Sequence, residues 1–272
     1  MKLRLPDRTL DLTPAVVMGI LNVTPDSFSD GGKYFSLDAA VKRANEMVAE
    51  GADIIDVGGE STRPGATPVS AADEMDRVIP VIERIARIEN FRDRSGKLPR
   101  PFIPVSVDTR HPTVAKAAVK AGATIVNCVE TLGASMAKIV RESGVAVICR
   151  CRSKEDYERA VEMVGDRQRV LFDPMIGFGT TRREDLELME RIPEFSRFAP
   201  VVAAVSRKRI IRTLAGGEAA SDRLGGSVGA AIWCALNGAS VIRVHDVKET
   251  FQALSILNYM DCRSRGKGTA IA

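Results

Sequence analysis

The chain has 272 residues and a net charge of +4, with 45% hydrophobic and 27% charged residues. This length and composition exclude a disordered chain and favour one large α/β domain, residues 1–272, which buries about 75% of its unfolded surface. The small, dispersed positive charge gives little support to nucleic-acid binding, because pockets for small anions explain it with fewer assumptions.

No apolar run reaches membrane-spanning length, and residues 1–12 lack the apolar core of a signal peptide. We therefore expect a cytoplasmic protein without a membrane partner. Of the five cysteines, only Cys149 and Cys151 lie close together in the sequence. One residue separates them and no second pair exists, so neither a structural zinc site nor a disulfide framework is expected.

The first segment predicts a hairpin, because Pro6-Asp7-Arg8 separates Lys2–Leu5 from Thr9–Leu12. A unit then recurs, in which a short apolar run precedes a polar loop and a helical stretch. The predicted strands are Val16–Leu21, Asp53–Val57, Phe102–Val107, Thr124–Asn127, Val145–Cys149, Arg169–Phe172, Val201–Val205 and Ser240–Val244. The predicted helices are Leu37–Glu50, Ala71–Arg87, Pro112–Ala121, Ser135–Glu142, Lys154–Val164, Arg183–Arg191, Ser221–Asn237 and Val247–Tyr259.

Eight strand–helix units are typical of a (β/α)₈ TIM barrel, and the hairpin is expected to cap its bottom. Nearly continuous apolar strands agree with a parallel sheet buried on both faces. The alternative is an open doubly wound sheet, which usually carries G-x-G-x-x-G after its first strand, where this chain has Asn22-Val23-Thr24-Pro25. The segment Asn90–Arg100, rich in Arg, predicts a surface loop.

Polar residues gather at the predicted carboxyl ends of the strands, where the active sites of such barrels lie. They are Asn22, Asp56, Asp108, Asn127, Asp173, Lys208, Arg243 and His245. Alone, each has an ordinary structural explanation: Asp108 as a helix cap, Asp173 as a turn residue, His245 as a packed core histidine. Their convergence on one mouth of the barrel favours a binding site.

The residue types suit an anionic ligand that contains a planar heterocycle. Asp108, Asn127 and Asp173 offer oxygen acceptors and an amide to ring N–H donors. Asn22, with nearby carboxylates, suits Mg²⁺, which prefers oxygen ligands. Positive charge for a phosphate or pyrophosphate comes from Arg63, Lys208, Arg243 and His245.

The segments Thr24–Tyr34 and Gly58–Ser70 are long and rich in Gly and Pro, and we expect them to be lids, with plain surface loops as the alternative. No Ser/His/Asp triad is evident. His111, before Pro112, is expected at the surface where a helix starts. Cys149 is expected to face the mouth as a small apolar residue rather than as a nucleophile.

Two long blocks, Gly19–Gly31 and Asp56–Gly65, carry the most specific patterns in the chain. Shorter blocks follow at Ser106–Thr109, Asp173-Pro174 with Ile176–Gly179, Ser206–Lys208 and Arg243–Val247. In this order, and over nearly the whole chain, they resemble the signatures of the dihydropteroate synthase family.

The resemblance implies a TIM barrel that condenses 6-hydroxymethyl-7,8-dihydropterin pyrophosphate with p-aminobenzoate in the presence of Mg²⁺ and releases pyrophosphate. It implies that the pterin is held by Asp108, Asn127, Asp173 and Lys208. It implies that the pyrophosphate and its metal are held by Asn22, Arg243 and His245. The arylamine side is implied to be formed by Thr62, Arg63, Pro64, Phe28 and Phe178.

By the same resemblance, the residues expected to act in catalysis are Asp108, Asp173, Lys208 and Arg63. The family is usually dimeric through its late helices, so a homodimer is expected, and Trp233 is a packing residue on one of these helices. The chain departs from the family's pattern at Cys128, Met175 and Ala204, where Asp, Gly and Gly are usual. The segment from Cys149-Arg150 to Asp173 is also shorter than usual.

Arg209 is a further departure, because the family usually has a Ser after the lysine, and that Ser helps to hold the p-aminobenzoate carboxylate. An added cation at Arg209, with Arg150 near it, suits a more anionic amine such as a ribosylated aminobenzene phosphate. The alternative is that Arg209 points to solvent at the start of a helix.

Two other functions stay open on the sequence alone. A pterin-binding methyltransferase shares the barrel but does not need the pyrophosphate set of Arg63, Arg243 and His245. A non-catalytic pterin-binding protein agrees with the departures from the family's pattern. Release of pyrophosphate separates both from a synthase.

Overall fold

The computed structural model describes residues 1–23, 33–60, 69–88, 91–92, 99–100 and 102–264. Its centre is a closed barrel made of β3 (Val16–Asn22), β4 (Ile54–Gly58), β7 (Val105–Asp108), β8 (Ile125–Cys128), β9 (Ala146–Arg150), β10 (Val170–Asp173), β11 (Val201–Ala203) and β12 (Ala239–Val244). Neighbouring strands are parallel all the way round, and β12 closes onto β3 from Val241↔Val16 to Val244↔Gly19. The predicted TIM barrel is confirmed.

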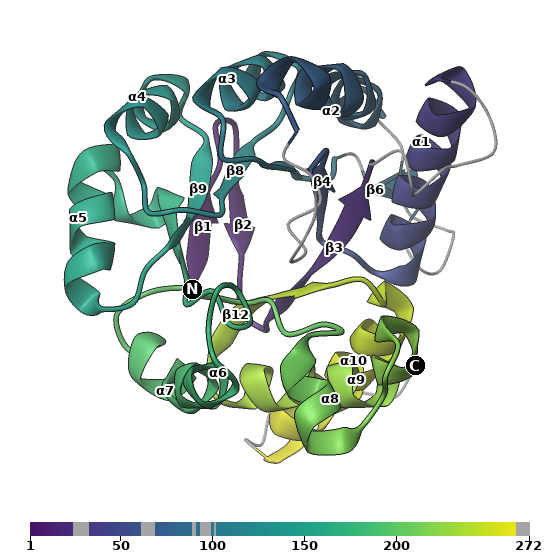
Figure 1. Cartoon of the computed structure of the whole chain (residues 1–272), viewed down its shortest axis with the longest axis vertical. Coiled ribbons are helices and arrows are strands. Elements are labelled where there is room, and N and C mark those ends of the chain that lie inside the picture. The colour runs from purple at the N-terminus through teal and green to yellow at the C-terminus, as the bar shows by residue number, and fades with distance from the viewer. Residues whose placement is uncertain (24–32, 61–68, 89–90, 93–98, 101, 265–272) are drawn as a thin grey trace.

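Helices form an outer ring around the barrel (Figure 1). The longer ones are α1 (Lys33–Glu50), α2 (Ala71–Ala86), α3 (Pro112–Lys120), α4 (Ala134–Ser143), α5 (Lys154–Val164), α6 (Arg182–Glu190), α9 (Leu224–Leu236) and α10 (Val247–Ser264). The short ones are α7 (Ile192–Phe195), α8 (Arg209–Ala215) and the 3₁₀ turns η2 (Arg167–Arg169) and η3 (Ala220–Arg223). The predicted helix Ser221–Asn237 is therefore divided between η3 and α9.

Two segments predicted as loops contain regular structure. The helix α1 begins at Lys33, inside the predicted loop Thr24–Tyr34. The predicted surface loop Asn90–Arg100 contains β5 (Phe91–Arg92), paired antiparallel with β6 (Pro99–Arg100). Strands of two residues carry too little alternation to be recognised in a sequence. The remainder of the first predicted lid and residues 61–68 of the second lie outside the described residues, so the lids stay a prediction.

The N-terminal hairpin closes the bottom of the barrel, as predicted. Strand β1 (Lys2–Arg4) pairs antiparallel with β2 (Thr9–Asp11), and both cross the barrel opening in Figure 1. The side chains of Leu3, Leu5 and Leu12 are buried against an apolar layer inside the barrel. Alternate strands β4, β8, β10 and β12 contribute Ile54, Ile125, Leu171 and Val241 to that layer.

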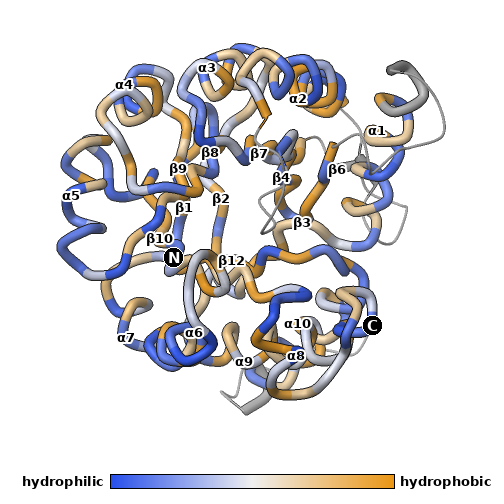
Figure 2. Tube along the Cα trace, viewed as in Figure 1, coloured by the Kyte–Doolittle hydropathy of each residue, from blue (hydrophilic) through white to orange (hydrophobic). Residues whose placement is uncertain are grey.

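A larger core fills the space between the strands and the surrounding helices. In Figure 2 the barrel strands are mostly hydrophobic, whereas α6 is largely hydrophilic. Cys149 belongs to this outer core and has no exposed surface. The prediction that Cys149 faces the mouth is therefore wrong. Its neighbour Ile148 points into the barrel, and successive residues of a strand point to opposite faces.

The short connection between β9 and β10 leaves the barrel wall intact. The two strands pair from Val170↔Val147 to Asp173↔Arg150. Within the connection, the buried Arg169 donates hydrogen bonds to the carbonyls of Val140 (2.9 Å), Val145 (3.4 Å) and Val164 (3.1 Å). Because Val140 and Val164 lie in the last turns of α4 and α5, one guanidinium satisfies carbonyl groups at two helix ends.

Candidate active site

A polar layer lies directly above the apolar layer inside the barrel. Two residues beyond that layer, strands β4, β8, β10 and β12 carry Asp56, Asn127, Asp173 and Arg243. Residues two apart on a strand share a face, so these side chains enter the mouth from alternate strands. The first three are buried, and the Arg243 side chain is only 17% exposed.

Arg243 joins two carboxylates of the mouth. Its Nε donates to Asp56 Oδ2 at 2.6 Å, and its Nη2 donates to Asp108 Oδ2 at 2.5 Å. The Nδ2 of Asn127 donates to the same oxygen of Asp56 at 3.1 Å. Burial lowers the pKa of Arg243, but the charges of Asp56 and Asp108 raise it, and the net result is a raised pKa. Arg243 is therefore a permanent cation in the mouth.

Asp108 is an unusual carboxyl group. Burial raises its pKa to about 7, and the Arg243 guanidinium opposes this rise without cancelling it. The structural alternative of a helix cap does not apply, because the N-cap of α3 is His111. Asp108 is thus available to the mouth and changes its charge near neutral pH.

Lys208 reaches the mouth from the loop after β11. Its Nζ donates to the carbonyl oxygen of Ile176. Burial lowers the pKa of Lys208 to about 8, although Asp173 acts in the opposite direction. Burial likewise raises the pKa of Asp173 above its usual value, although the positive charge of Lys208 acts in the opposite direction. The pair therefore places one basic and one acidic group together at low solvent exposure.

Backbone geometry after β10 makes room for this lysine. Gly177 has a φ of 74°, and a Cβ at this position would lie 2.6 Å from Lys208 Cδ. Only glycine meets both demands. Met175 also has a positive φ, 58°, which explains why glycine suits this position. Its backbone N–H donates to Asp173 Oδ1 at 2.7 Å, which holds the turn in place.

A second network ties the loops after β11 and β12 together. The Ser206 hydroxyl lies 3.1 Å from His245 Nδ1 and accepts a hydrogen bond from the His245 backbone N–H at 3.3 Å. Arg207 forms a bidentate ion pair with Asp246, in which Nε donates to Oδ2 at 2.9 Å and Nη2 donates to Oδ1. The backbone of Arg207, with φ 58°, is held by Arg223 and Ser227. These contacts fix the positions of Lys208 and His245.

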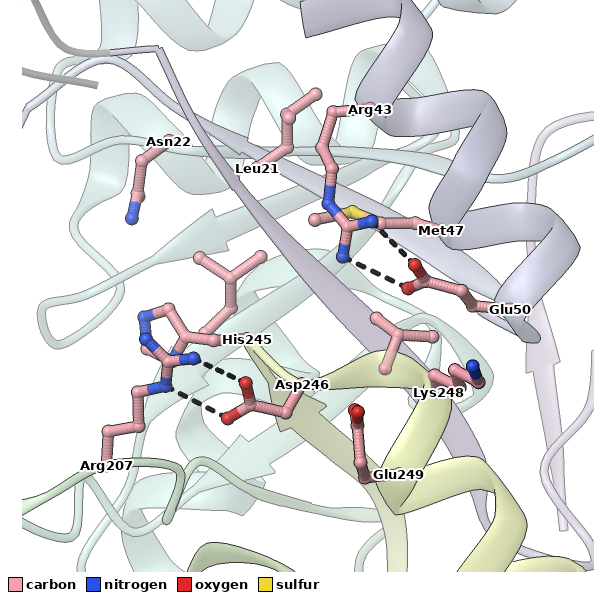
Figure 3. Close-up of a pocket in the computed structure, with 12 residues that line it drawn as sticks. Leu21, Asn22, Arg43, Met47, Glu50, Arg207, His245, Asp246, Lys248 and Glu249 are labelled. Atoms are coloured by element: carbon pink, nitrogen blue, oxygen red, sulfur yellow. Dashed lines mark hydrogen bonds and ion pairs between the residues drawn. The ribbon is translucent and has the colours of Figure 1, made fainter. Parts of the chain in front are cut away.

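A cavity of about 420 Å³ opens beside the second network. Asn22 and His245 line it, together with the bidentate ion pairs Arg43–Glu50 and Arg207–Asp246, which flank it in Figure 3. The carboxylates of the polar layer do not line it. Half of the lining residues belong to α1 and to the first turn of α10, so the cavity lies beside the mouth. The polar layer forms the inner part of the mouth, and Asn22 and His245, at the ends of β3 and β12, form its outer part next to this cavity.

The structure brings together most of the residues predicted for the site. The Cβ that Gly58 lacks would lie 3.6 Å from Asn22 Oδ1 and 3.8 Å from Asp108 Oδ2, so these side chains are neighbours. Phe178 is half-buried in the loop after β10. Arg209 is exposed at the first residue of α8. Four predicted residues lie outside the described residues: Phe28, Thr62, Arg63 and Pro64.

Besides Cys149, one further residue differs from its prediction, and two residues beside the site are not predicted. His111 does stand where a helix starts, but its side chain is only 28% exposed and its Nε2 lies 4.0 Å from Glu74 Oε2, so it is not a plain surface residue. Arg207 and Asp246 are not predicted as site residues, and Asp56 is predicted at the mouth but without a role. Strand alternation adds that Asp56 points into the barrel, because Ile54 two residues earlier belongs to the inner core. The Arg207–Asp246 ion pair connects two loops that are far apart in the sequence, so no local sequence pattern predicts it.

The oxygen donors at the mouth fit a hard cation that arrives with a phosphorylated ligand. Among the described residues, no cluster of three or more His, Cys, Asp or Glu side chains could hold a metal by itself. Mg²⁺ commonly takes only one or two protein oxygens and completes its shell with phosphates and waters. Asn22 Oδ1, close to Asp108, offers such an oxygen.

Comparisons with known proteins agree with this geometry. The family model described as "Pterin binding enzyme" matches residues 18–158 and 150–245. The dihydropteroate synthase of Escherichia coli (strain K12) is 40% identical over 94% of this chain and 95% of its own length. That of Bacillus subtilis (strain 168) is 40% identical over 90% of this chain and 88% of its own. The solved structure of Xanthomonas albilineans dihydropteroate synthase with 4-aminobenzoic acid is similar, with a TM-score of 0.85 and 38% identity over 96% of this chain and 98% of that one.

Proposed function

The chain belongs to the family of pterin binding enzymes and, within it, to the dihydropteroate synthases, and from this premise we infer its reaction. It transfers a pterinylmethyl group in folate biosynthesis. The amine nitrogen of p-aminobenzoate forms a bond to the methylene carbon of 6-hydroxymethyl-7,8-dihydropterin pyrophosphate, the C–O bond breaks, pyrophosphate leaves, and the amine releases one proton. The observation that carries this conclusion is the mouth itself, where buried acceptors meet the permanent cation Arg243.

We propose that the inner part of the mouth holds the pterin. Asp108, Asn127 and Asp173 present oxygen acceptors to ring N–H groups, and the half-buried side chain of Lys208 lies beside them. As the C–O bond breaks, positive charge develops on the pterin side, and the carboxylates of Asp108 and Asp173 stabilise it electrostatically. The arylamine is neutral at pH 7, so its attack requires no strong base.

We propose that the outer part holds the pyrophosphate. Negative charge grows on this leaving group. His245 stabilises it from the outer part as a hydrogen-bonding ring, and Arg243 stabilises it as a cation from the polar layer below. Asn22 would hold Mg²⁺ through its amide oxygen. When bound, this ion supplies further positive charge to the departing pyrophosphate. Arg63 is proposed to complete the set of cations.

The arylamine is proposed to bind against Thr62, Arg63, Pro64 and Phe178, with Arg209 near its carboxylate. Arg209 directly follows Lys208 and is open to solvent, so it can reach an anionic substrate that enters the mouth. Replacing Arg209 by Ser tests this contact. A raised KM for p-aminobenzoate with unchanged KM for the pterin substrate is expected, and an unchanged KM for both removes Arg209 from the site.

The reaction is tested by measuring pyrophosphate release from the purified protein with the pterin pyrophosphate and Mg²⁺. Parallel reactions contain p-aminobenzoate, a ribosylated aminobenzene phosphate, or no amine. We expect turnover with p-aminobenzoate. Tight pterin binding without turnover would favour a binding protein, and turnover only with the phosphorylated amine would reassign the acceptor.

We propose that two copies of the chain associate through α8, α9 and α10. These helices expose large apolar side chains, namely Leu214 (64%), Trp233 (37%), Leu236 (64%), Ile256 (69%) and Met260 (60%). Groups of exposed apolar residues mark interaction surfaces.

We also propose that the protein acts in the cytoplasm. Across the part of the chain that the structure describes, no helix has the length and apolar character needed to cross a bilayer.

A further inference from the structure

Asp56 makes no contact with solvent, yet it touches two residues assigned above to substrate. It has no exposed surface on β4. Its Oδ2 accepts from Arg243 Nε at 2.6 Å and from Asn127 Nδ2 at 3.1 Å. These contacts place Asp56 beneath the inner part of the mouth, where it supports both sides of the substrate.

The chemistry of this contact decides how the Asn127 amide is turned. A primary amide has a donor end and an acceptor end, and rotation by half a turn exchanges them. Asp56 forms an ion pair with Arg243, so it is a carboxylate and accepts hydrogen bonds without donating any. An amide with its oxygen toward Asp56 would lose the hydrogen bond and oppose two negative oxygens. Asn127 must therefore turn its NH₂ group toward Asp56.

This orientation turns the other end of the amide away from Asp56. Within the described parts of the chain, no hydrogen bond to Asn127 Oδ1 is present, whereas Nδ2 is already engaged. Asn127 sits in the same layer as Asp173 and pairs in register with Asp108. We propose that Asp56 is a positioning residue that locks the Asn127 amide with Oδ1 toward the bound pterin, so that the site selects a ring with an N–H donor at that point. The proposal deepens the proposed function and rests on it.

A pair of substitutions separates the acceptor of Asp56 from its charge. In Asp56→Asn, the carbonyl oxygen can still accept from Asn127 Nδ2 and Arg243 Nε, while the negative charge is lost and an NH₂ group takes the place of Oδ1, which has no hydrogen-bond partner in the wild type. In Asp56→Leu, the shape is similar but no acceptor remains. Ser106→Ala is the matched control, because Ser106 is the register partner of Asp56, is buried, and has a hydroxyl without a hydrogen bond.

Binding is measured by fluorescence titration of 6-hydroxymethylpterin, which carries the pterin ring without the pyrophosphate. We expect Asp56→Leu to weaken binding about tenfold or more, since the unlocked amide presents the wrong end, and Asp56→Asn to weaken it less than about threefold. Ser106→Ala should bind like the wild type. The KM for p-aminobenzoate should stay unchanged in Asp56→Asn, which a general structural defect would not allow.

Two results would overturn the proposal: equal losses in both Asp56 variants, which would assign the effect to charge, or unchanged binding in Asp56→Leu. Failure of the wild type to bind the pterin would instead contradict the proposed function. Should Asp56→Leu not fold, the side-chain ¹H–¹⁵N signal of Asn127 provides a second measurement. Assigned through Asn127→Asp, it should exchange slowly with solvent in the wild type, and fast exchange would contradict the lock.

Discussion

Asp108 and Lys208 face the same mouth, and burial moves the pKa of each toward neutrality, to about 7 and about 8. As the pH falls through 7, Asp108 takes up a proton and no longer accepts an N–H group as a carboxylate. As the pH rises through 8, Lys208 loses its charge. The site therefore has its working charges only within a narrow range of pH.

We predict a bell-shaped pH profile of kcat/KM for the pterin substrate, with limbs at about 7 and about 8. Steady-state rates measured across both limbs test this. In Lys208→Arg, whose side chain stays charged, the alkaline limb should move to higher pH while the acid limb stays. A wild-type profile that is flat across both pKa values would contradict the assignment.

Gly177 and Gly179 offer a matched pair of single substitutions. Both have positive φ, but a Cβ at Gly177 meets Lys208, whereas a Cβ at Gly179 meets nothing within 4 Å. Each change to Ala should lower the unfolding free energy by about 1 kcal/mol, because alanine is strained at such φ. Only Gly177→Ala should also lower kcat/KM. We expect a decrease of about tenfold or more, because the displaced Lys208 would lose one charged contact with the substrate. Equal activities of the two variants in the same assay would refute the close approach.

Single residues of the site were predictable where a strand pattern pointed to them. Asp108, Asn127 and Asp173 each end a short apolar run, so strand direction alone placed them at one mouth. The Arg207–Asp246 pair and the hydrogen bond from Asn127 to Asp56 connect separate strands or loops, and only the folded chain brings them together. Arg209 is a different case: it is exposed at the first residue of α8, which agrees with either predicted alternative, so its contact with the substrate stays a proposal.

Among the elements, the short β9–β10 connection depends on one buried guanidinium. Arg169 donates to carbonyl groups of Val140, Val145 and Val164. Arg169→Met keeps much of the apolar stem but removes these three hydrogen bonds and the ion pair with Asp166, while the Val140 carbonyl keeps the hydrogen bond from the Gly144 N–H. We expect a loss of about 2–4 kcal/mol in unfolding free energy. Chemical denaturation measures it.

Arg167→Met is the control for that change. Arg167 lies in the same 3₁₀ turn, but its side chain is 51% exposed and pairs with Glu158 at the surface. Exposed ion pairs contribute about 0–1 kcal/mol, so this variant should unfold nearly as the wild type does. If both variants lost the same stability, the helix-end contacts of Arg169 would not be what holds the connection.

The long elements follow from periodicity, whereas short ones need the tertiary structure. The barrel strands and the longer helices were predicted to within a few residues. Strands β5 and β6 and helices α7 and α8 are shorter than the windows in which a period is visible. The sequence prediction places Cys149 on the wrong face of its strand. The residues around Cys149 are apolar on both faces of β9, so the sequence carries no alternation that separates the inner face of the barrel from the outer one.

For the whole molecule, the exposed apolar residues of α9 and α10 predict self-association. The double substitution Leu236→Asp with Ile256→Asp places two charges on that surface, and we expect it to convert dimers to monomers in analytical ultracentrifugation. Lys138→Glu on α4, equally exposed, should leave the sedimentation unchanged. A wild type that sediments as a monomer at all concentrations would refute the proposed interface.

We conclude that this barrel joins the methylene carbon of a pterin pyrophosphate to an arylamine, with cleavage of the C–O bond to the pyrophosphate. The most direct measurement follows both products in one reaction, 7,8-dihydropteroate by mass spectrometry and pyrophosphate by a coupled assay, with p-aminobenzoate varied. We predict equal amounts of the two products, both dependent on the amine and both lost in Asp173→Ala. Pterin binding with neither product formed, or dihydropteroate formed without pyrophosphate, would contradict it.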